Sequence, residues 1–230
     1  MSSSSSSDSR SYRAARRARA ALSRASRRAV MTAAVALGAT FLMNAQANAA
    51  PAVGQPAPDF IAVDTAGKPH RLSDFAGKYV VLEWTNPGCP FVRKHYGSGN
   101  MPATQKAATD KGVVWLAINS TERAASDYLQ PQALEAWMKE HSGVPTAVLM
   151  DEDGVIGRTY GARTTPHIFI VDPKGTLVYA GGIDSIASAR TEDIETATNY
   201  VNQALREAFG GKPISAATTR PYGCSIKYKA

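Results

Sequence analysis

The chain has 230 residues, and its 26 Lys and Arg against 19 Asp and Glu give a formal net charge of +7. Eight Arg and a single Asp lie within residues 1–49, so residues 50–230 carry 18 basic and 18 acidic side chains and no net charge. A neutral remainder lacks the positive surface of proteins that bind nucleic acid or anionic membranes, and the sequence excludes those partners.

Residues 1–49 have the pattern of a cleaved export signal. Their Ser- and Arg-rich start is followed by an Ala-rich apolar run at residues 29–43 and by the small-x-small site Ala47-Asn48-Ala49. This order predicts a periplasmic or secreted protein, exported by the Sec route or, given Arg27-Arg28, by the twin-arginine route. A mitochondrial transit peptide is the alternative. The apolar run is too short to span a bilayer comfortably, so no membrane span is expected after cleavage.

The remainder predicts one α/β domain, residues 50–211, and a C-terminal tail, residues 212–230. Its length of about 180 residues is enough to bury one sizeable core. Apolar runs predict strands, and apolar residues at spacings of three and four predict helices. The expected strands are residues 59–63, 68–72, 79–82, 113–119, 146–150, 167–171 and 176–180. The expected helices are one from residue 90 to a break at residues 97–100, and others at residues 103–110, 131–141 and 191–209.

These elements predict a mixed central sheet flanked by helices, with an N-terminal β-hairpin extension. The hairpin turns at residues 64–67, and a second hairpin turns at Asp172-Pro173-Lys174-Gly175. The run at residues 79–82 is apolar throughout, which indicates a strand buried on both faces. The tail is rich in Pro and Thr and is expected to be flexible.

Cys89 lies between a strand and a helix. It follows Asn86-Pro87-Gly88 and precedes Pro90, which suits the first helical position because its missing N–H costs nothing there. A thiol at a helix N-terminus faces unpaired N–H groups and the positive end of the helix dipole, and both favour the thiolate. The thiolate is the nucleophilic form, so we expect sulfur chemistry and a partly exposed side chain. A buried inert cysteine is the alternative.

Metal and cofactor chemistry are not expected. The four histidines are scattered, and none lies at ligand spacing from another His or from a pair of Cys. The sequence contains no phosphate-binding glycine loop. The chain has two cysteines, Cys89 and Cys224, and an exported protein can join them in a disulfide.

Four segments of the sequence resemble the redoxin, peroxiredoxin-like (alkyl hydroperoxide reductase/thiol-specific antioxidant) branch of the thioredoxin superfamily. They are VVLEWTNPGCPFV, GVVWLAIN, TTPHIFIVDPKG and PYGCSIKY, and the likeness extends from Val53 to Tyr228. The resemblance implies a thioredoxin-like fold and an antioxidant oxidoreductase. It places Cys89 at the position of the attacking cysteine.

The sequence departs from this superfamily in two places. The second cysteine of a thioredoxin CxxC pair is replaced by Val92, so the intermediate at Cys89 needs another thiol, and Cys224 is the internal candidate. A purely structural Cys89–Cys224 disulfide is the alternative. The Pro and Thr of the peroxiredoxin motif are replaced by Leu82 and Asn86, which favours disulfide chemistry over a peroxide pocket.

The resemblance implies roles for further residues. Thr165-Pro166 matches the cis-proline loop, which docks a substrate strand beside Cys89 and Pro90. Glu83 matches a buried acid that relays protons, and burial is expected to raise its pKa. Arg163 is expected to hold a thiolate or a peroxide oxygen. The alternatives are a trans proline at Pro166, a salt-bridged Glu83 and a surface charge at Arg163.

The sequence therefore predicts an exported thiol-dependent oxidoreductase. Cys89 attacks a hydroperoxide or a disulfide, Cys224 resolves the intermediate, and an external thiol reductant restores both thiols. A non-catalytic binding module with a thioredoxin fold and a structural disulfide is the second hypothesis. The choice of substrate and the oligomeric state stay open at this point.

Overall fold

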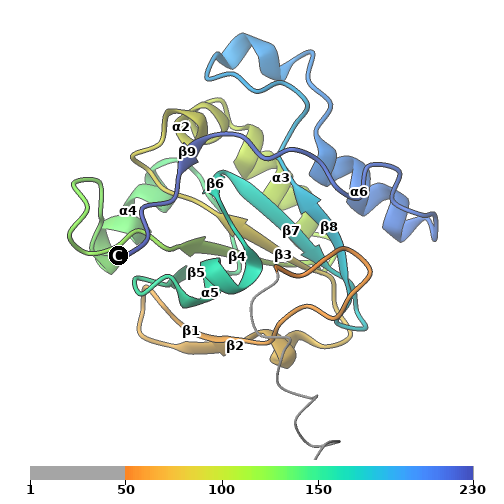
Figure 1. The fold of residues 1–230 in the computed structure, drawn as a ribbon. Helices are drawn as coiled ribbons and strands as arrows, with labels where there is room; N and C mark the ends of the chain where they lie inside the picture. The colour runs from red at the N-terminus through yellow and green to blue at the C-terminus, as the bar shows by residue number, and fades with distance from the viewer. Residues whose placement is uncertain (1–49, 230) are drawn as a thin grey trace, which may run out of the picture. The chain divides into compact units, whose positions relative to one another are not determined.

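A computed structural model describes residues 50–229 of the chain (Figure 1). The export signal predicted for residues 1–49 lies outside the described residues. Among the residues that are described, no helix is both long enough and apolar enough to cross a membrane.

A seven-stranded mixed sheet with the order β2-β1-β5-β4-β3-β7-β8 forms the centre of the fold. The strands are β1 (Ile61–Asp64), β2 (Pro69–Arg71), β3 (Val80–Trp84), β4 (Val114–Asn119), β5 (Ala147–Met150), β7 (His167–Val171) and β8 (Leu177–Gly181). A separate two-stranded sheet pairs β6 (Thr164–Thr165) with β9 (Cys224–Ser225). The helices are α2 (Pro90–Gly97), α3 (Asn100–Thr109), α4 (Pro131–Glu140), α5 (Val155–Tyr160) and α6 (Tyr200–Phe209), with 3-10 turns η1 (Leu72–Phe75) and η2 (Thr191–Ile194).

The pairing of the strands confirms the predicted thioredoxin-like α/β fold. The central strand β3 is parallel to β4 and antiparallel to β7, and β4 is parallel to β5. Both predicted hairpins are present, since β1 is antiparallel to β2 and β7 to β8. The first hairpin extends the sheet because β1 also pairs with β5.

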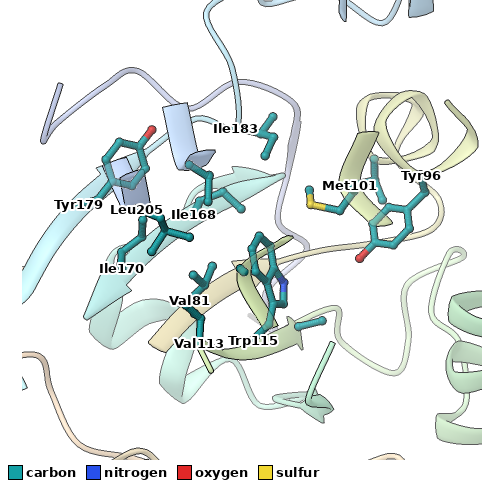
Figure 2. Close-up of a cluster of buried hydrophobic side chains, with 14 of the residues drawn as sticks. Val81, Tyr96, Met101, Val113, Trp115, Ile168, Ile170, Tyr179, Ile183 and Leu205 are labelled. Carbon is teal, nitrogen blue, oxygen red and sulfur yellow. The ribbon is translucent and has the colours of Figure 1, made fainter. Parts of the chain in front are cut away.

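Every residue of β3 is buried, as its continuous apolar run predicts. Alternate side chains of a strand point to opposite faces, and each face of this sheet has its own apolar cluster. Val81 and Trp115 belong to the cluster on one face, with residues of α2, α3, α4 and α6 (Figure 2). Leu82 and Leu116 belong to the cluster on the other face, which includes Ile156 of α5.

The last predicted helix is wrong in its N-terminal half. Only residues 191–194 form a short 3-10 turn, and α6 begins at Tyr200 rather than at residue 191. The Asn199 side chain caps α6 by accepting a hydrogen bond from the Asn202 N–H. The chain just before this cap pairs with Ser185, whose N–H donates to the Thr198 carbonyl. These contacts hold Asn199 in an extended conformation that a continuous helix would not allow.

The C-terminal tail is attached along its length, whereas the sequence predicted a flexible segment. Near its start, the Ala180 N–H donates to the Ala217 carbonyl, and the Thr219 N–H donates to the Ala180 carbonyl. The tail then passes over the end of the sheet as β9, close to α2 and β6 in Figure 1. Further on, the Glu122 N–H donates to the carbonyl of Lys227.

Candidate active site

Cys89 occupies the position that its sequence context predicts. It is the N-cap residue of α2, with an extended backbone (φ −84°, ψ 124°) and Pro90 in the first turn. The side chain of Asn86 shapes the preceding turn by accepting a 2.7 Å hydrogen bond from the Gly88 N–H. Gly88 has no room for a side chain, because an added Cβ would lie 2.6 Å from the Cβ of Asp127.

Two backbone groups contact the sulfur of Cys89. Its thiol donates a 3.0 Å hydrogen bond to the Thr165 carbonyl, and the backbone N–H of Cys224 lies 3.4 Å from its Sγ. Cys224 reaches this position because β9 pairs antiparallel with β6, which sets Cys224 opposite Thr165. The structure thus brings together both cysteines and the loop before Pro166.

Cys89 is only 1% exposed, so the expectation of a partly open side chain is wrong. The tail covers it, since the residues of β9 pair with the strand that contacts the sulfur. Cys89 therefore lies at the edge of an apolar cluster, with polar backbone groups of Thr165 and Cys224 beside its Sγ. Both cysteines are free thiols.

The two thiols differ in acidity. Burial raises the pKa of Cys89, but hydrogen bonds with the side chains of Cys224 and Thr165 and with the backbone N–H groups of Val92 and Cys224 outweigh burial, and the pKa lies below its usual value. Burial, the hydrogen bond with Cys89 and the charge of Cys89 raise the pKa of Cys224 to about 12. Cys89 is therefore the thiol that ionises first, as an attacking cysteine requires.

The Thr165–Pro166 peptide bond is cis, as the resemblance implied. The tail lies very close to this loop at Gly223. An added Cβ at Gly223 would lie 2.0 Å from the Thr165 carbonyl oxygen, and its backbone has a φ of +134°. Both observations require glycine at the position before Cys224.

Glu83 is fully buried in β3, and burial raises its pKa, which hydrogen bonds only partly offset. Its carboxyl group accepts three hydrogen bonds from neutral side chains. The donors are Tyr96 Oη at 2.9 Å, Gln105 Nε2 at 3.0 Å and Trp115 Nε1 at 2.7 Å. Glu83 is thus linked through Tyr96 to α2, the helix that Cys89 caps.

Arg163 contacts the site through its backbone. Its carbonyl accepts a 3.0 Å hydrogen bond from the Ile226 N–H, and its side chain is exposed.

Burial, and then the nearby charge of Arg163, lower the pKa of His167 to about 4, so His167 is neutral at physiological pH.

The sequence did not identify a buried polar cluster beneath the tail. Lys94 and His95 of α2 face Asp184, with Lys94 Nζ and His95 Nε2 each 3.7 Å from Asp184 Oδ2. The Tyr222 hydroxyl donates a 2.5 Å hydrogen bond to Asp184 Oδ1 and lies 3.0 Å from His95 Nε2. Burial lowers the pKa of His95 to about 4. The only local signal was the adjacent Lys94 and His95 in the predicted helix.

A second polar contact fastens the tail on the other side of Cys224. Asp127 Oδ2 forms a 2.7 Å salt bridge with Lys227 Nζ and accepts a 3.0 Å hydrogen bond from Asn86 Nδ2. Asn86 is the residue that shapes the turn before Cys89, so the tail and this turn share one carboxylate. The tail is therefore held at Tyr222 and Lys227, on either side of Cys224.

Three comparisons relate the chain to known proteins. The model of the AhpC/TSA family matches residues 53–180, which include Cys89 and end before the tail. Thiol-disulfide oxidoreductase ResA of Geobacillus thermodenitrificans is 30% identical over 133 residues, which are 55% of this chain and 67% of that protein.

Two solved structures are similar over most of the chain. A hypothetical protein from Sinorhizobium meliloti 1021 has a TM-score of 0.64 and 25% identity, covering 79% of this chain and 97% of that one. An uncharacterized conserved protein from Geobacillus kaustophilus has a TM-score of 0.64 and 26% identity, covering 77% of this chain and 93% of that one.

Proposed function

Because the chain belongs to the AhpC/TSA family, we propose that it is a thiol-dependent oxidoreductase in which Cys89 attacks and Cys224 resolves. The observation that carries this proposal is the position of Cys224, whose backbone N–H lies 3.4 Å from the Sγ of Cys89. The similarity to a protein named thiol-disulfide oxidoreductase supports an oxidoreductase activity.

The reaction with a disulfide transfers two electrons. The Cys89 thiolate attacks one sulfur, the S–S bond breaks, and one substrate thiolate leaves, so a mixed disulfide remains on Cys89. Cys224 then loses its proton and attacks the Sγ of Cys89. The second substrate thiol leaves, and the protein holds a Cys89–Cys224 disulfide that an external dithiol reduces.

A hydroperoxide is the second proposed substrate. The Cys89 thiolate then takes one oxygen, the O–O bond breaks, and an alcohol or water leaves. Cys224 condenses with the resulting sulfenic acid, and water is released. Both routes end in the same internal disulfide, and the second would give the protein its proposed antioxidant role.

The chain's other site residues are proposed to support these steps. Pro90 starts the helix whose first N–H groups stabilise the Cys89 thiolate, and Thr165 and Pro166 line its other side. Glu83 is proposed to exchange protons with the site from within the core. Export is proposed from residues 1–49, and an oxidising compartment suits a protein that cycles through a disulfide.

Mass mapping tests the pair directly. The purified protein is treated with one equivalent of hydrogen peroxide or of a small disulfide, and its peptides are analysed without reduction. We expect a Cys89–Cys224 disulfide in the wild type, a sulfenic acid or mixed adduct on Cys89 in Cys224→Ala, and no turnover in Cys89→Ser. Unchanged turnover in Cys89→Ser refutes the proposal. A Cys89–Cys224 bond that resists mild reductant supports the structural disulfide of a binding module instead.

A further inference from the structure

The C-terminal segment lies where an incoming polypeptide strand would pair beside Cys89. In β6 and β9, Thr165 is opposite Cys224 and Thr164 is opposite Ser225, in antiparallel register. The Ile226 N–H donates to the Arg163 carbonyl at 3.0 Å and extends this pairing by one residue. Adding a strand to an exposed backbone edge is a general way to bind an extended peptide. Here the chain's own tail already fills that edge.

Tyr222 is the deepest anchor of this segment. Its ring packs edge-on against Phe91 with centroids 5.7 Å apart, and Lys94 Nζ lies 5.8 Å from its centroid. Its hydroxyl bonds to Asp184 and His95, whose side chains are 2% and 0% exposed. A buried network of this kind loses much of its stability when one member is removed, because the remaining polar groups are left without partners.

The other anchor is weaker. The side chain of Lys227 is 46% exposed and that of Asp127 is 20% exposed, so solvent screens much of their attraction. Tyr228 also holds the tail, through a 2.8 Å hydrogen bond from its hydroxyl to the Ala162 carbonyl, but it is only partly buried. Tyr222 is therefore the most buried of these three anchors. Gly223, which alone lets the backbone lie against Thr165, connects this anchor directly to Cys224.

We infer that residues 222–226 occupy the place of a polypeptide substrate, so that the tail excludes polypeptide disulfides from Cys89 more strongly than it excludes small oxidants. The inference rests on the proposed function, because it concerns the substrates of Cys89. Because Cys89 is only 1% exposed, any oxidant needs the tail to open, but a small oxidant needs only a narrow opening to reach its Sγ. A polypeptide disulfide also needs the backbone edge of Thr164 and Thr165, which becomes free only when β9 separates from β6. Tyr222 is the buried anchor that holds the tail next to β9.

The test measures the first attack by Cys89 alone. The background variant Cys224→Ser keeps the β9 backbone and removes the second thiol. Two probes carry the same leaving group, a thionitrobenzoate joined by a disulfide to free cysteine or to the cysteine of the hexapeptide Tyr-Gly-Cys-Ser-Ile-Lys. In both reactions Cys89 forms a disulfide with the probe's cysteine and releases the thionitrobenzoate anion. The probes therefore differ in size and not in sulfur chemistry.

In the background variant we expect the peptide probe to react more slowly than the cysteine probe. Adding Tyr222→Ala is expected to raise the peptide rate by about tenfold or more and to change the cysteine rate by less than about threefold. Tyr222→Phe, which keeps the ring, is expected to give a smaller shift in the same direction and carries the test if Tyr222→Ala does not fold.

The matched control is Tyr160→Phe. It removes another buried tyrosine hydroxyl, which donates a 2.7 Å hydrogen bond to the Pro58 carbonyl in the cluster on the opposite face of the sheet. The control is expected to leave the ratio of the two rates unchanged. Equal rates for both probes in the background variant, an equal acceleration of both by the Tyr222 variants, or the same shift in the control overturns the inference. If neither probe reacts with Cys89 in any variant, the proposed function fails as well.

Discussion

The backbone N–H of Cys224 lies 3.4 Å from the Sγ of Cys89, although 135 residues separate the two cysteines along the chain. This contact exists because the tail continues past Tyr222 and pairs with Thr165 as a strand. It places a second thiol beside the first without a CxxC motif. The proposed Cys89–Cys224 disulfide therefore does not need a second cysteine at position 92, which Val92 occupies.

The first prediction concerns the acidity of the two thiols. Burial raises the pKa of Cys89, but its hydrogen bonds with the side chains of Cys224 and Thr165 and with nearby backbone N–H groups lower the pKa further than burial raises it. We expect the alkylation rate of Cys89 to have its midpoint below the usual value of about 8.5. Cys224, with a pKa raised to about 12, stays protonated and unmodified over the same range. Iodoacetamide labelling followed by peptide mass analysis at each pH measures both.

The protein unfolded in urea serves as the reference for this titration, because both cysteines should then have the ordinary midpoint. A folded Cys89 with a midpoint at or above that of the unfolded protein contradicts the activation of this thiol. Faster labelling of Cys224 than of Cys89 reverses the proposed roles.

The second prediction concerns Gly223. Gly223→Ala puts a Cβ 2.0 Å from the Thr165 carbonyl oxygen at a φ of +134°, which alanine rarely adopts. The tail must move away from β6, and we expect formation of the Cys89–Cys224 disulfide to slow by about ten- to a hundredfold. Quenched-flow oxidation with non-reducing mass analysis follows the reaction.

Gly97→Ala is the control for that substitution. Gly97 lies in α2, and an added Cβ there meets nothing within 4 Å. The oxidation rate of this variant is expected to match the wild type. Its free energy of unfolding is expected to rise by up to about 1 kcal/mol, because alanine favours a helix more than glycine does. Normal oxidation of Gly223→Ala would show that close approach of the tail to Thr165 is unnecessary.

The third prediction concerns the buried ion pair beneath the tail. The side chains of Lys94 and Asp184 are 0% and 2% exposed, and Nζ lies 3.7 Å from Oδ2. Lys94→Met leaves the Asp184 carboxylate buried without its cation, and we expect a loss of about 3–5 kcal/mol in the free energy of unfolding. Urea denaturation monitored by circular dichroism measures the difference.

Lys106→Met is the comparison for this pair. Lys106 bonds to Asp110 on the surface of α3, and both side chains are more than half exposed. Loss of this surface ion pair is expected to lower the free energy of unfolding by less than about 1 kcal/mol. A similar decrease in the free energy of unfolding in both variants would mean that burial does not make the Lys94–Asp184 pair more important for stability than a surface pair.

The fourth prediction concerns Glu83. Burial raises its pKa in the folded protein, so the carboxyl group contributes stability that is fully present below the unfolded pKa and is lost as pH rises through the folded pKa. Glu83→Gln removes this titration and keeps a similar shape. The stability of the variant relative to wild type is therefore expected to increase from about pH 4 to pH 7.

Urea denaturation at several pH values measures that difference. A relative stability that does not change with pH contradicts the raised pKa. If Glu83 also relays protons, Glu83→Gln changes the pH dependence of disulfide formation between Cys89 and Cys224. A pH profile identical to wild type would limit Glu83 to supporting Tyr96 and Trp115 in the core.

The sequence by itself determined the strand, turn and helix around Cys89, the N-terminal hairpin and the fold class. These features depend on neighbouring residues: Pro90 starts a helix, Gly88 allows a tight turn, and an apolar run makes a buried strand. The helix before residue 200 was predicted wrongly because Ser185, from another segment, pairs with residue 198 and competes with helical hydrogen bonds.

Only the tertiary structure decided that Cys89 is covered, that Cys224 lies opposite Thr165, and that Tyr222 is held by Asp184. Each contact joins segments tens of residues apart, and no local periodicity or propensity records which segments will meet. Burial and hydrogen bonding over the completed sheet select those partners. The choice of Cys89 as the proposed nucleophile thus used local information, whereas its exposure and the position of the second thiol depended on how the chain packs.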